Sequence, residues 1–246
     1  MCRDETDSFF SGGIVQLSNG FDWSQVDDVL LDMDGTLLDR HFDNFFFEEE
    51  LPRRYAVKHG LEVVEAREKL FALYRTVEGE LDWTNLHYWT KTLGIDVIAM
   101  TKEFDYMIGF LPHAEEFLRH LNTEGKRVSL ITNAHTTGVA IKVEKTGLDH
   151  YVHRIVDAFE VGYLKMRAEY WPVCQRLLRF EPTRTLYLDD DESCLHAAQA
   201  YGIGHIFHSA KSSSQLPPHR SERYRSVESL AAFIQHPVAE KPVQLL

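Results

Sequence analysis

Cysteine, basic charge and long apolar runs are all scarce in this 246-residue chain. The three cysteines, Cys2, Cys174 and Cys194, are widely separated and form no Cys-x-x-Cys pair, so we expect free thiols rather than a disulfide framework. Residues 1–20 lack the apolar stretch of a signal peptide. No run approaches the roughly 20 apolar residues that a membrane span needs. These absences predict a cytoplasmic protein with no membrane segment.

The charge balance narrows the choice of partners. Lys and Arg number 26 against 38 Asp and Glu, a formal net charge of −12, which disfavours nucleic acids and anionic membranes as partners. Hydrophobic residues make up 44% of the chain, as in ordinary globular proteins. At about 150 residues per domain, the length allows one to two domains, or one domain with a large insertion.

Short apolar runs that end abruptly in polar residues indicate a parallel sheet. Because their apolar residues do not alternate with polar ones, they are typical of strands buried on both faces. Helical patterns lie between them, so we expect a doubly wound α/β sheet. The runs cover residues 29–31, 128–131, 155–156, 186–188 and 205–207. A last short helix is expected around 227–234.

Residues 39–110 break this alternation, since they contain helical patterns but no convincing buried strand. Helices are expected at 62–77 and 83–93, with breaks at prolines and glycines between them. We therefore expect a helical insertion after the first strand. The predicted division is a core of 21–38 and 111–246, an inserted domain of 39–110, and an N-terminal extension of 1–20.

The polar residues that follow the strands are expected to share one site, because ligands of open α/β sheets bind outside the carboxyl ends of the strands. Asp32 and Asp34 follow the first strand, and Gly35 directly after them lets the chain turn and bring both carboxylates together. An ordinary acidic turn remains the alternative. A calcium loop does not fit, because the apolar Leu37 and Leu38 follow where oxygen ligands are needed.

Two other strand ends add complementary groups. Thr132 and Asn133 offer a hydroxyl and an amide that suit phosphoryl oxygens. The run Asp189–Asp191 adds carboxylates, and a divalent cation is the natural counter-charge for such a cluster. Oxygen donors without cysteine or clustered histidine favour Mg²⁺. Lys165 follows a glycine-containing turn between these segments.

The order of these motifs resembles that of the haloacid dehalogenase-like hydrolases. The four motifs run from Asp32 to Asp191, and the resemblance implies a Rossmann-like core and identifies the helical insertion as a cap. A narrower resemblance, to the bacterial GMP/IMP nucleotidases, extends into the cap. It rests on the segments 31–39, 42–44, 86–89 and 132–135.

The resemblance implies a phosphomonoester hydrolase with an aspartyl-phosphate intermediate. Asp32 would be the nucleophile and Asp34 the general acid and base. Thr132 and Lys165 would hold the transferring oxygens. Since an alkoxide leaving group needs a proton and a halide does not, Asp34 favours phosphate ester hydrolysis over dehalogenation.

The resemblance also implies which atoms hold Mg²⁺. They are the Asp32 carboxylate, the main-chain carbonyl of Asp34 and, on motif alignment, Asp190. Asp189 would orient Lys165 or share the metal, and the triple aspartate leaves the ligand ambiguous by one position.

The expected substrate is a small phosphate ester, most specifically a purine nucleoside monophosphate. Phe42, Asp43 and Asn44, next to the first motif, and Asn133 are the expected substrate contacts, while Phe46 and Trp89 are expected in the core of the cap. Other readings stay open: a sugar phosphate or phosphoglycolate phosphatase, a phosphomutase, or a non-catalytic binding module. The sequence does not determine the oligomeric state.

Overall fold

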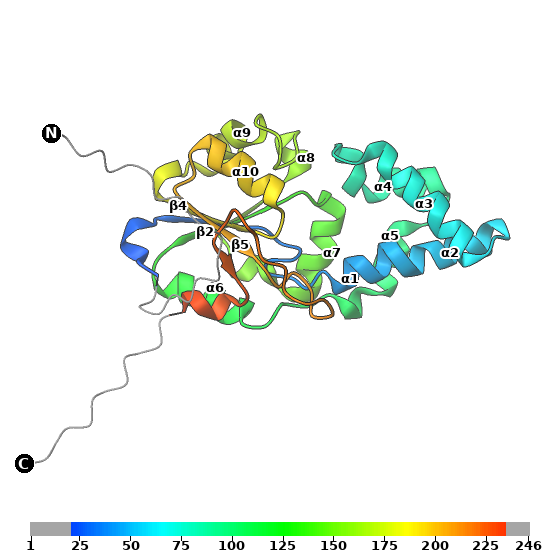
Figure 1. Ribbon diagram of the computed structural model, residues 1–246, viewed down its shortest axis with the longest axis horizontal. Helices are drawn as coiled ribbons and strands as arrows, with labels where there is room; N and C mark the ends of the chain where they lie inside the picture. The colour runs from blue at the N-terminus through cyan, green and yellow to red at the C-terminus, as the bar shows by residue number, and fades with distance from the viewer. Residues whose placement is uncertain (1–20, 235–246) are drawn as a thin grey trace, which may run out of the picture.

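A six-stranded parallel sheet forms the centre of the fold. The computed structural model describes residues 21–234, so the predicted N-terminal extension and Cys2 lie outside the described residues. The strands lie in the order β3-β2-β1-β4-β5-β6, and every neighbouring pair is parallel (Figure 1). Their bounds are β1 Asp28–Leu31, β2 Arg127–Thr132, β3 Arg154–Asp157, β4 Thr185–Asp189, β5 His205–Ser209 and β6 Ser226–Val227.

The doubly wound α/β fold is thereby confirmed, and its topology determines where a ligand binds. The chain runs outward from β1 to β3 on one side, then returns to β4 beside β1 and runs outward to β6 on the other. The order of the strands therefore reverses between β1 and β4. The crevice at the carboxyl ends of these two strands is the usual ligand site of such sheets.

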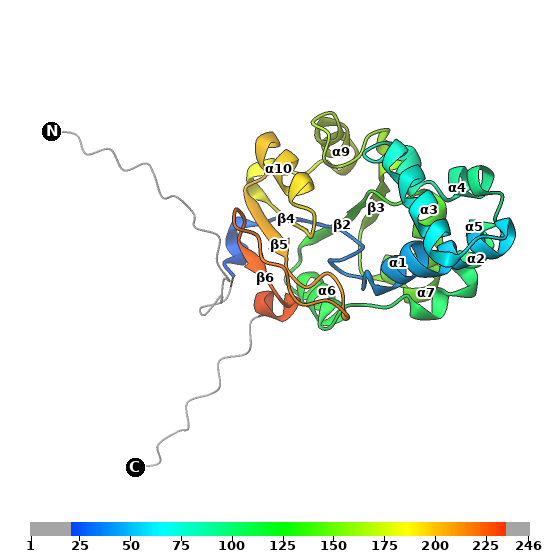
Figure 2. The same ribbon diagram turned by 45° about the vertical axis from the view of Figure 1, so that its right-hand side comes forward.

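Successive residues of the strands face opposite sides of the sheet, and helices bury both sides. Leu31 and Leu188 pack with α6 (Ala114–Thr123) and α7 (Thr136–Thr146), while Leu30 and Tyr187 pack with α9 (Tyr170–Leu178) and α10 (Glu192–Tyr201). The short α8 (Ala158–Val161) leads from β3 towards α9. Figures 1 and 2 show α8 to α10 on one face and α6 on the other. This double burial explains the unalternated apolar runs.

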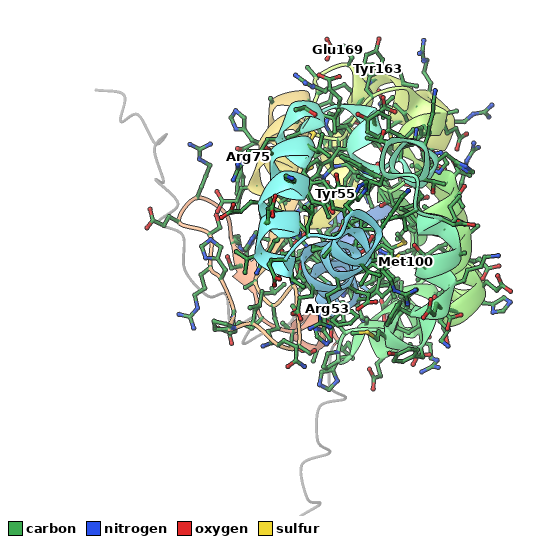
Figure 3. The ribbon with its side chains drawn as sticks, turned by 90° about the vertical axis from the view of Figure 1, so that its right-hand side faces the viewer. Arg53, Tyr55, Arg75, Met100, Tyr163 and Glu169 are labelled. Atoms are coloured by element: carbon green, nitrogen blue, oxygen red, sulfur yellow. The ribbon has the colours of Figure 1, made fainter. Side chains whose placement is uncertain are left out.

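The segment between β1 and β2 is helical, as the sequence predicts, and forms a lobe at one end of the molecule (Figures 1 and 3). We call α1 to α5 the cap helices. Phe46 and Trp89 are buried at 0% and 1% exposure, which confirms the expectation that they are core residues. The bounds are α1 His41–Phe45, α2 Leu51–His59, α3 Val63–Val77, α4 Leu86–Leu93 and α5 Val97–Glu103, with a π-helical segment at Phe46–Glu50 and 3-10 turns at Leu81–Thr84 and Asp105–Met107.

The expected last helix at 227–234 is wrong in part. Ser226 and Val227 form β6, which pairs with β5, and only a 3-10 turn, Leu230–Phe233, follows. Val227 and Phe233 are both buried, so the segment covers the sheet rather than forming a free helix. Further 3-10 turns lie at Trp23–Gln25, Leu148–His150 and Pro182–Arg184. Within residues 21–234, no helix is long and apolar enough to cross a membrane.

Candidate active site

A buried network of charges lies at the carboxyl ends of β1 and β4. Asp32 follows β1, Asp189 ends β4, and Lys165 reaches both from the loop between α8 and α9. Lys165 Nζ contacts Asp32 Oδ1 and lies 2.7 Å from Asp189 Oδ2. The Tyr187 hydroxyl also donates to Asp189. All three charged residues are at most 5% exposed, so each charge depends on the others for compensation.

Burial controls the protonation of this network. It raises the pKa of Asp32 well above its ordinary value, and Lys165 offsets only part of that rise. For Lys165, burial alone would lower the pKa, but the neighbouring Asp189 and Asp32 carboxylates raise it instead. The lysine is therefore held charged, while the negative charge on Asp32 calls for further positive charge nearby.

Three carboxylates converge at this place. One oxygen each from Asp32, Asp189 and Asp190 lies within 4.8 Å of the other two. Burial raises the pKa of Asp190 to about 6, although Arg40 Nη1 lies 2.7 Å from its Oδ2. Asp32 Oδ2 is buried and has no hydrogen-bond partner in the described part of the chain. Converging oxygen donors and an unpartnered carboxylate oxygen fit a hard divalent cation.

The structure narrows the choice of metal ligand among the three consecutive aspartates, Asp189–Asp191. Asp191 Oδ1 accepts hydrogen bonds from the main-chain N and the hydroxyl of Ser193, so Asp191 is the N-cap of α10. Asp189 and Asp190 are the two that join Asp32.

Gly35 is required where the first motif turns. Its φ is +96°, and a Cβ there would lie 2.6 Å from Cγ of Asp190 and 2.7 Å from Cδ of Arg40. Only glycine combines this conformation with so close an approach. Gly35 therefore allows Asp190 and Arg40 to lie against the turn that carries Asp32 and Asp34.

Thr132 and Asn133 lie at the end of β2, as the sequence predicts, and the side chains of both accept main-chain hydrogen bonds. Thr132 Oγ1 accepts from the main-chain N of Ala134 at 3.1 Å. Asn133 Oδ1 accepts from the main-chain N of Lys165 at 2.8 Å, so Asn133 fixes the loop that carries the lysine. Both residues still line the cavity described below.

Lys142 was not predicted from the sequence. Its Nζ lies 2.7 Å from Asp34 Oδ1 and donates hydrogen bonds of 2.8 and 2.9 Å to the two carboxylate oxygens of Asp43. In the sequence, Lys142 looks like any lysine on a helix, and only the apolar residues around it, Val139 and Ile141, hint that its face of α7 is buried. Arg40 was also missed, although a cation so close to an acidic motif is a usable signal.

The expected substrate contacts all line the cavity, but Phe42 and Asp43, like Asn133, have other partners. Phe42 is 3% exposed, and its ring lies 5.6 Å from Lys142 Nζ and 5.6 Å from the Phe46 ring. Asp43 forms the ion pair with Lys142, and burial raises the pKa of Asp43 to about 6. Asn44 has no partner among the described side chains.

One cavity of about 500 Å³ joins the charged site to the cap helices. Its floor contains Asp32, Thr132 and Lys165, and its wall on the cap side contains Phe47, Phe71, Tyr74, Trp83 and Trp89. A volume of this size suits a small organic ligand. A phosphate at the floor would leave room for an aromatic group against the wall.

Direct hydrogen bonds hold the cap against the sheet. Thr84 Oγ1 donates to the main-chain O of Asn133 at 2.7 Å, and His87 Nε2 lies 3.0 Å from Thr137 Oγ1. Arg167 Nη2 donates to the main-chain O of Gly79 at 3.0 Å. These contacts enclose the cavity between the two parts of the chain.

The sequence of residues 26–202 matches the haloacid dehalogenase-like hydrolase family. The chain belongs to this family. It is 35% identical over 212 residues, covering 86% of the chain and 96% of the relative, to GMP/IMP nucleotidase YrfG of Escherichia coli K12, and to the same extent to the protein of that name in Shigella flexneri.

A solved HAD phosphatase from Thermococcus onnurineus superposes on this hydrolase with a TM-score of 0.69. The identity is 18%, over 83% of this chain and 94% of that one, so the superposition bears on the fold alone. The family match and the curated relatives identify the chain as an enzyme, a phosphatase. The predicted family is thereby confirmed.

Proposed function

We propose that this hydrolase is a magnesium-dependent 5′-nucleotidase that releases phosphate from purine mononucleotides such as GMP and IMP. The observation that carries the proposal is the single cavity that runs from Asp32 and Lys165 to the aromatic wall of the cap. Such a wall can stack on a purine while the phosphate lies at the floor. The name of the relatives, GMP/IMP nucleotidase, supports this choice of ester.

The proposed reaction has two steps, both centred on Asp32. First, an Asp32 carboxylate oxygen attacks phosphorus; the bond from phosphorus to the ribose oxygen breaks, and Asp34 gives that oxygen a proton. Then water attacks the aspartyl-phosphate, Asp34 takes up the water proton, and inorganic phosphate leaves with Asp32 restored. Each residue ends the cycle as it began.

Thr132 and Lys165 hold the transferring phosphoryl group in this proposal. Lys165 places a fixed positive charge beside Asp32 Oδ1, where it counters the repulsion between nucleophile and phosphate. No described residue accepts a hydrogen bond from the Thr132 hydroxyl, which can therefore donate to a phosphoryl oxygen. Asn133 contributes by fixing the Lys165 loop.

Asp32, Asp190 and the main-chain carbonyl of Asp34 would hold Mg²⁺, and Asp189 borders the same place. The unpartnered Asp32 Oδ2 and the all-oxygen donor set support this assignment. When bound, the ion supplies the positive charge that draws the phosphate and the nucleophile together. Asp189 primarily orients Lys165, since its Oδ2 accepts a hydrogen bond from the lysine ammonium group.

A panel of phosphate esters assayed with Mg²⁺ tests the proposal. The panel contains GMP, IMP, AMP, pyrimidine nucleotides, sugar phosphates, phosphoglycolate and p-nitrophenyl phosphate. We expect the highest kcat/KM for the purine nucleotides. A sugar phosphate or phosphoglycolate as the best substrate would replace the nucleotidase assignment, transfer of phosphate within a sugar would indicate a mutase, and no phosphate release would favour a binding role.

The division into a cap of 39–110 and a core of 21–38 and 111–246 remains our proposal for the domain organisation. It agrees with the helical content between β1 and β2. The cytoplasmic location also remains a prediction from the sequence.

A further inference from the structure

Lys142 is a buried cation that no step of the proposed reaction uses. It is 5% exposed, and its Nζ lies 2.7 Å from Asp34 and 2.8 Å from Asp43. Burying an ammonium group is unfavourable unless paired charges surround it. Burial would lower the pKa of Lys142, but Asp34 and Asp43 raise it above the ordinary value, so the group stays charged. Its position is therefore fixed by two carboxylates at once.

The three partners come from three separate parts of the fold. Asp34 belongs to the turn after β1, Asp43 to α1 in the cap, and Lys142 to α7 beside the sheet. The Phe42 ring, 5.6 Å from Nζ, packs beside the ammonium. Lys142 thus links the Asp34 carboxylate to α7 and, through Asp43, to the first cap helix. Only 23% of the Asp34 side chain is exposed.

This link bears on the chemistry because the proton that Asp34 transfers must reach one particular oxygen. The shortest contact of the ion pair is made through Asp34 Oδ1, and Asp34 Oδ2 accepts no hydrogen bond from a described residue. Asp34 lines the cavity, so with Oδ1 paired to Lys142, Oδ2 is the oxygen that remains for proton transfer to the leaving group. Misplacing a catalytic group by about 1 Å can cost about 10²-fold in rate.

We propose that Lys142 is a positioning residue, which holds the Asp34 carboxylate in the orientation for proton transfer and does so through its joint ion pair with Asp43. The role rests on the proposed two-step hydrolysis. It needs only that Asp34 protonates an alkoxide leaving group, so it holds for any alkyl phosphate that the enzyme accepts.

Comparing substrates with different leaving groups distinguishes a positioning role of Lys142 from a purely structural one. A nucleoside leaves as a strong base and needs the Asp34 proton, whereas p-nitrophenolate leaves without it. In single-turnover experiments, we expect Lys142→Met to slow nucleoside release about 10- to 100-fold and p-nitrophenol release less than about 3-fold. Equal losses with both substrates would overturn the proposal.

A double-mutant cycle provides an independent readout. If Lys142 acts through Asp34, then Asp34→Asn and the double variant Asp34→Asn/Lys142→Met release nucleoside at the same rate, within about 2-fold. Multiplication of the two single losses would show that Lys142 acts elsewhere, which would contradict the proposal.

Lys145 provides the matched control. It lies one turn further along α7 and forms a more exposed ion pair with Asp105 at 3.2 Å. Lys145→Met should leave both rates within about 2-fold of the parent, as is usual for surface positions. A loss equal to that of Lys142→Met would show that the effect belongs to the helix and not to Lys142.

Asp43→Asn covers the case in which Lys142→Met does not fold, because it removes one partner and leaves Lys142 paired with Asp34. We expect a smaller loss with the same selectivity, about 3- to 10-fold for nucleoside release alone. A loss of equal size for both substrates would overturn the proposal that Lys142 and Asp43 position Asp34.

If the panel shows no nucleotide turnover, the nucleotidase assignment fails, and the same comparison of variants is made with the best alkyl phosphate.

Discussion

The two ends of the cavity differ in how their side chains are held. At the sheet, Asp32 and Lys165 are at most 5% exposed and pair with each other. On the cap side, Trp83 is 38% exposed, and Arg75 and Glu78 line the cavity without an ion-pair partner in residues 21–234. The charged side chains at the sheet end are thus fixed by one another, while side chains at the cap end remain free to contact a substrate. We infer that chemistry and substrate choice are separated in space.

The largest effect is expected at the sheet end, from Asp32→Asn. Removing the nucleophile should lower phosphate release by at least about 10³-fold for every ester, because the covalent step is lost. Steady-state assays with two esters check this, and thermal unfolding checks that the variant folds. Substantial turnover by a folded variant would remove Asp32 from the mechanism.

Asp34→Asn should lower turnover of nucleotides by about 10² to 10⁴-fold, the usual range for a lost acid–base group. The measurement is kcat for the best nucleotide. Near-normal turnover would refute the acid–base role and, with it, the part assigned to Lys142.

Chelation of Mg²⁺ should lower turnover by on the order of 10²-fold, since a bound cation contributes several kcal/mol of charge stabilisation. Added Mg²⁺ should restore it. The check is phosphate release with and without chelator, and full activity after complete chelation would show that the carboxylate cluster works without a metal.

The smallest effect is expected at the cap end and should be selective. Trp83→Ala should raise KM for a purine nucleotide about 5- to 100-fold, the range for loss of one stacking contact, and change KM for p-nitrophenyl phosphate less. Tyr106, on the cap but outside the cavity and 67% exposed, provides the control variant Tyr106→Ala. Equal changes in KM for both substrates would contradict the inference that substrate choice lies at the cap end of the cavity.

The residues that meet at the sheet end could be predicted from the sequence because they lie in short motifs at strand ends. The runs before Asp32 and Asp189 predict buried parallel strands, and the topology of such sheets brings their ends together. The two-residue strand β6 is too short to leave a pattern, so the sequence predicts a helix in its place.

Positions that depend on packing between distant elements were not predictable in this way. Lys142 is 99 residues from Asp43, and nothing in local spacing pairs the two. Phe42, an expected substrate contact, lines the cavity but is only 3% exposed and packs beside Phe46 and Lys142, which the sequence does not predict. Such contacts depend on how the cap docks on the sheet, which a single sequence does not encode in any local pattern.

Trapping the phosphorylated enzyme tests the central claim most directly. The enzyme is mixed with a labelled phosphate ester and Mg²⁺, quenched in acid within the first turnover and mapped by peptide mass spectrometry. We predict one phosphoryl group, on Asp32, and none in Asp32→Asn. Label on a different residue, or steady phosphate release with no phosphorylated peptide at any time, would contradict the account.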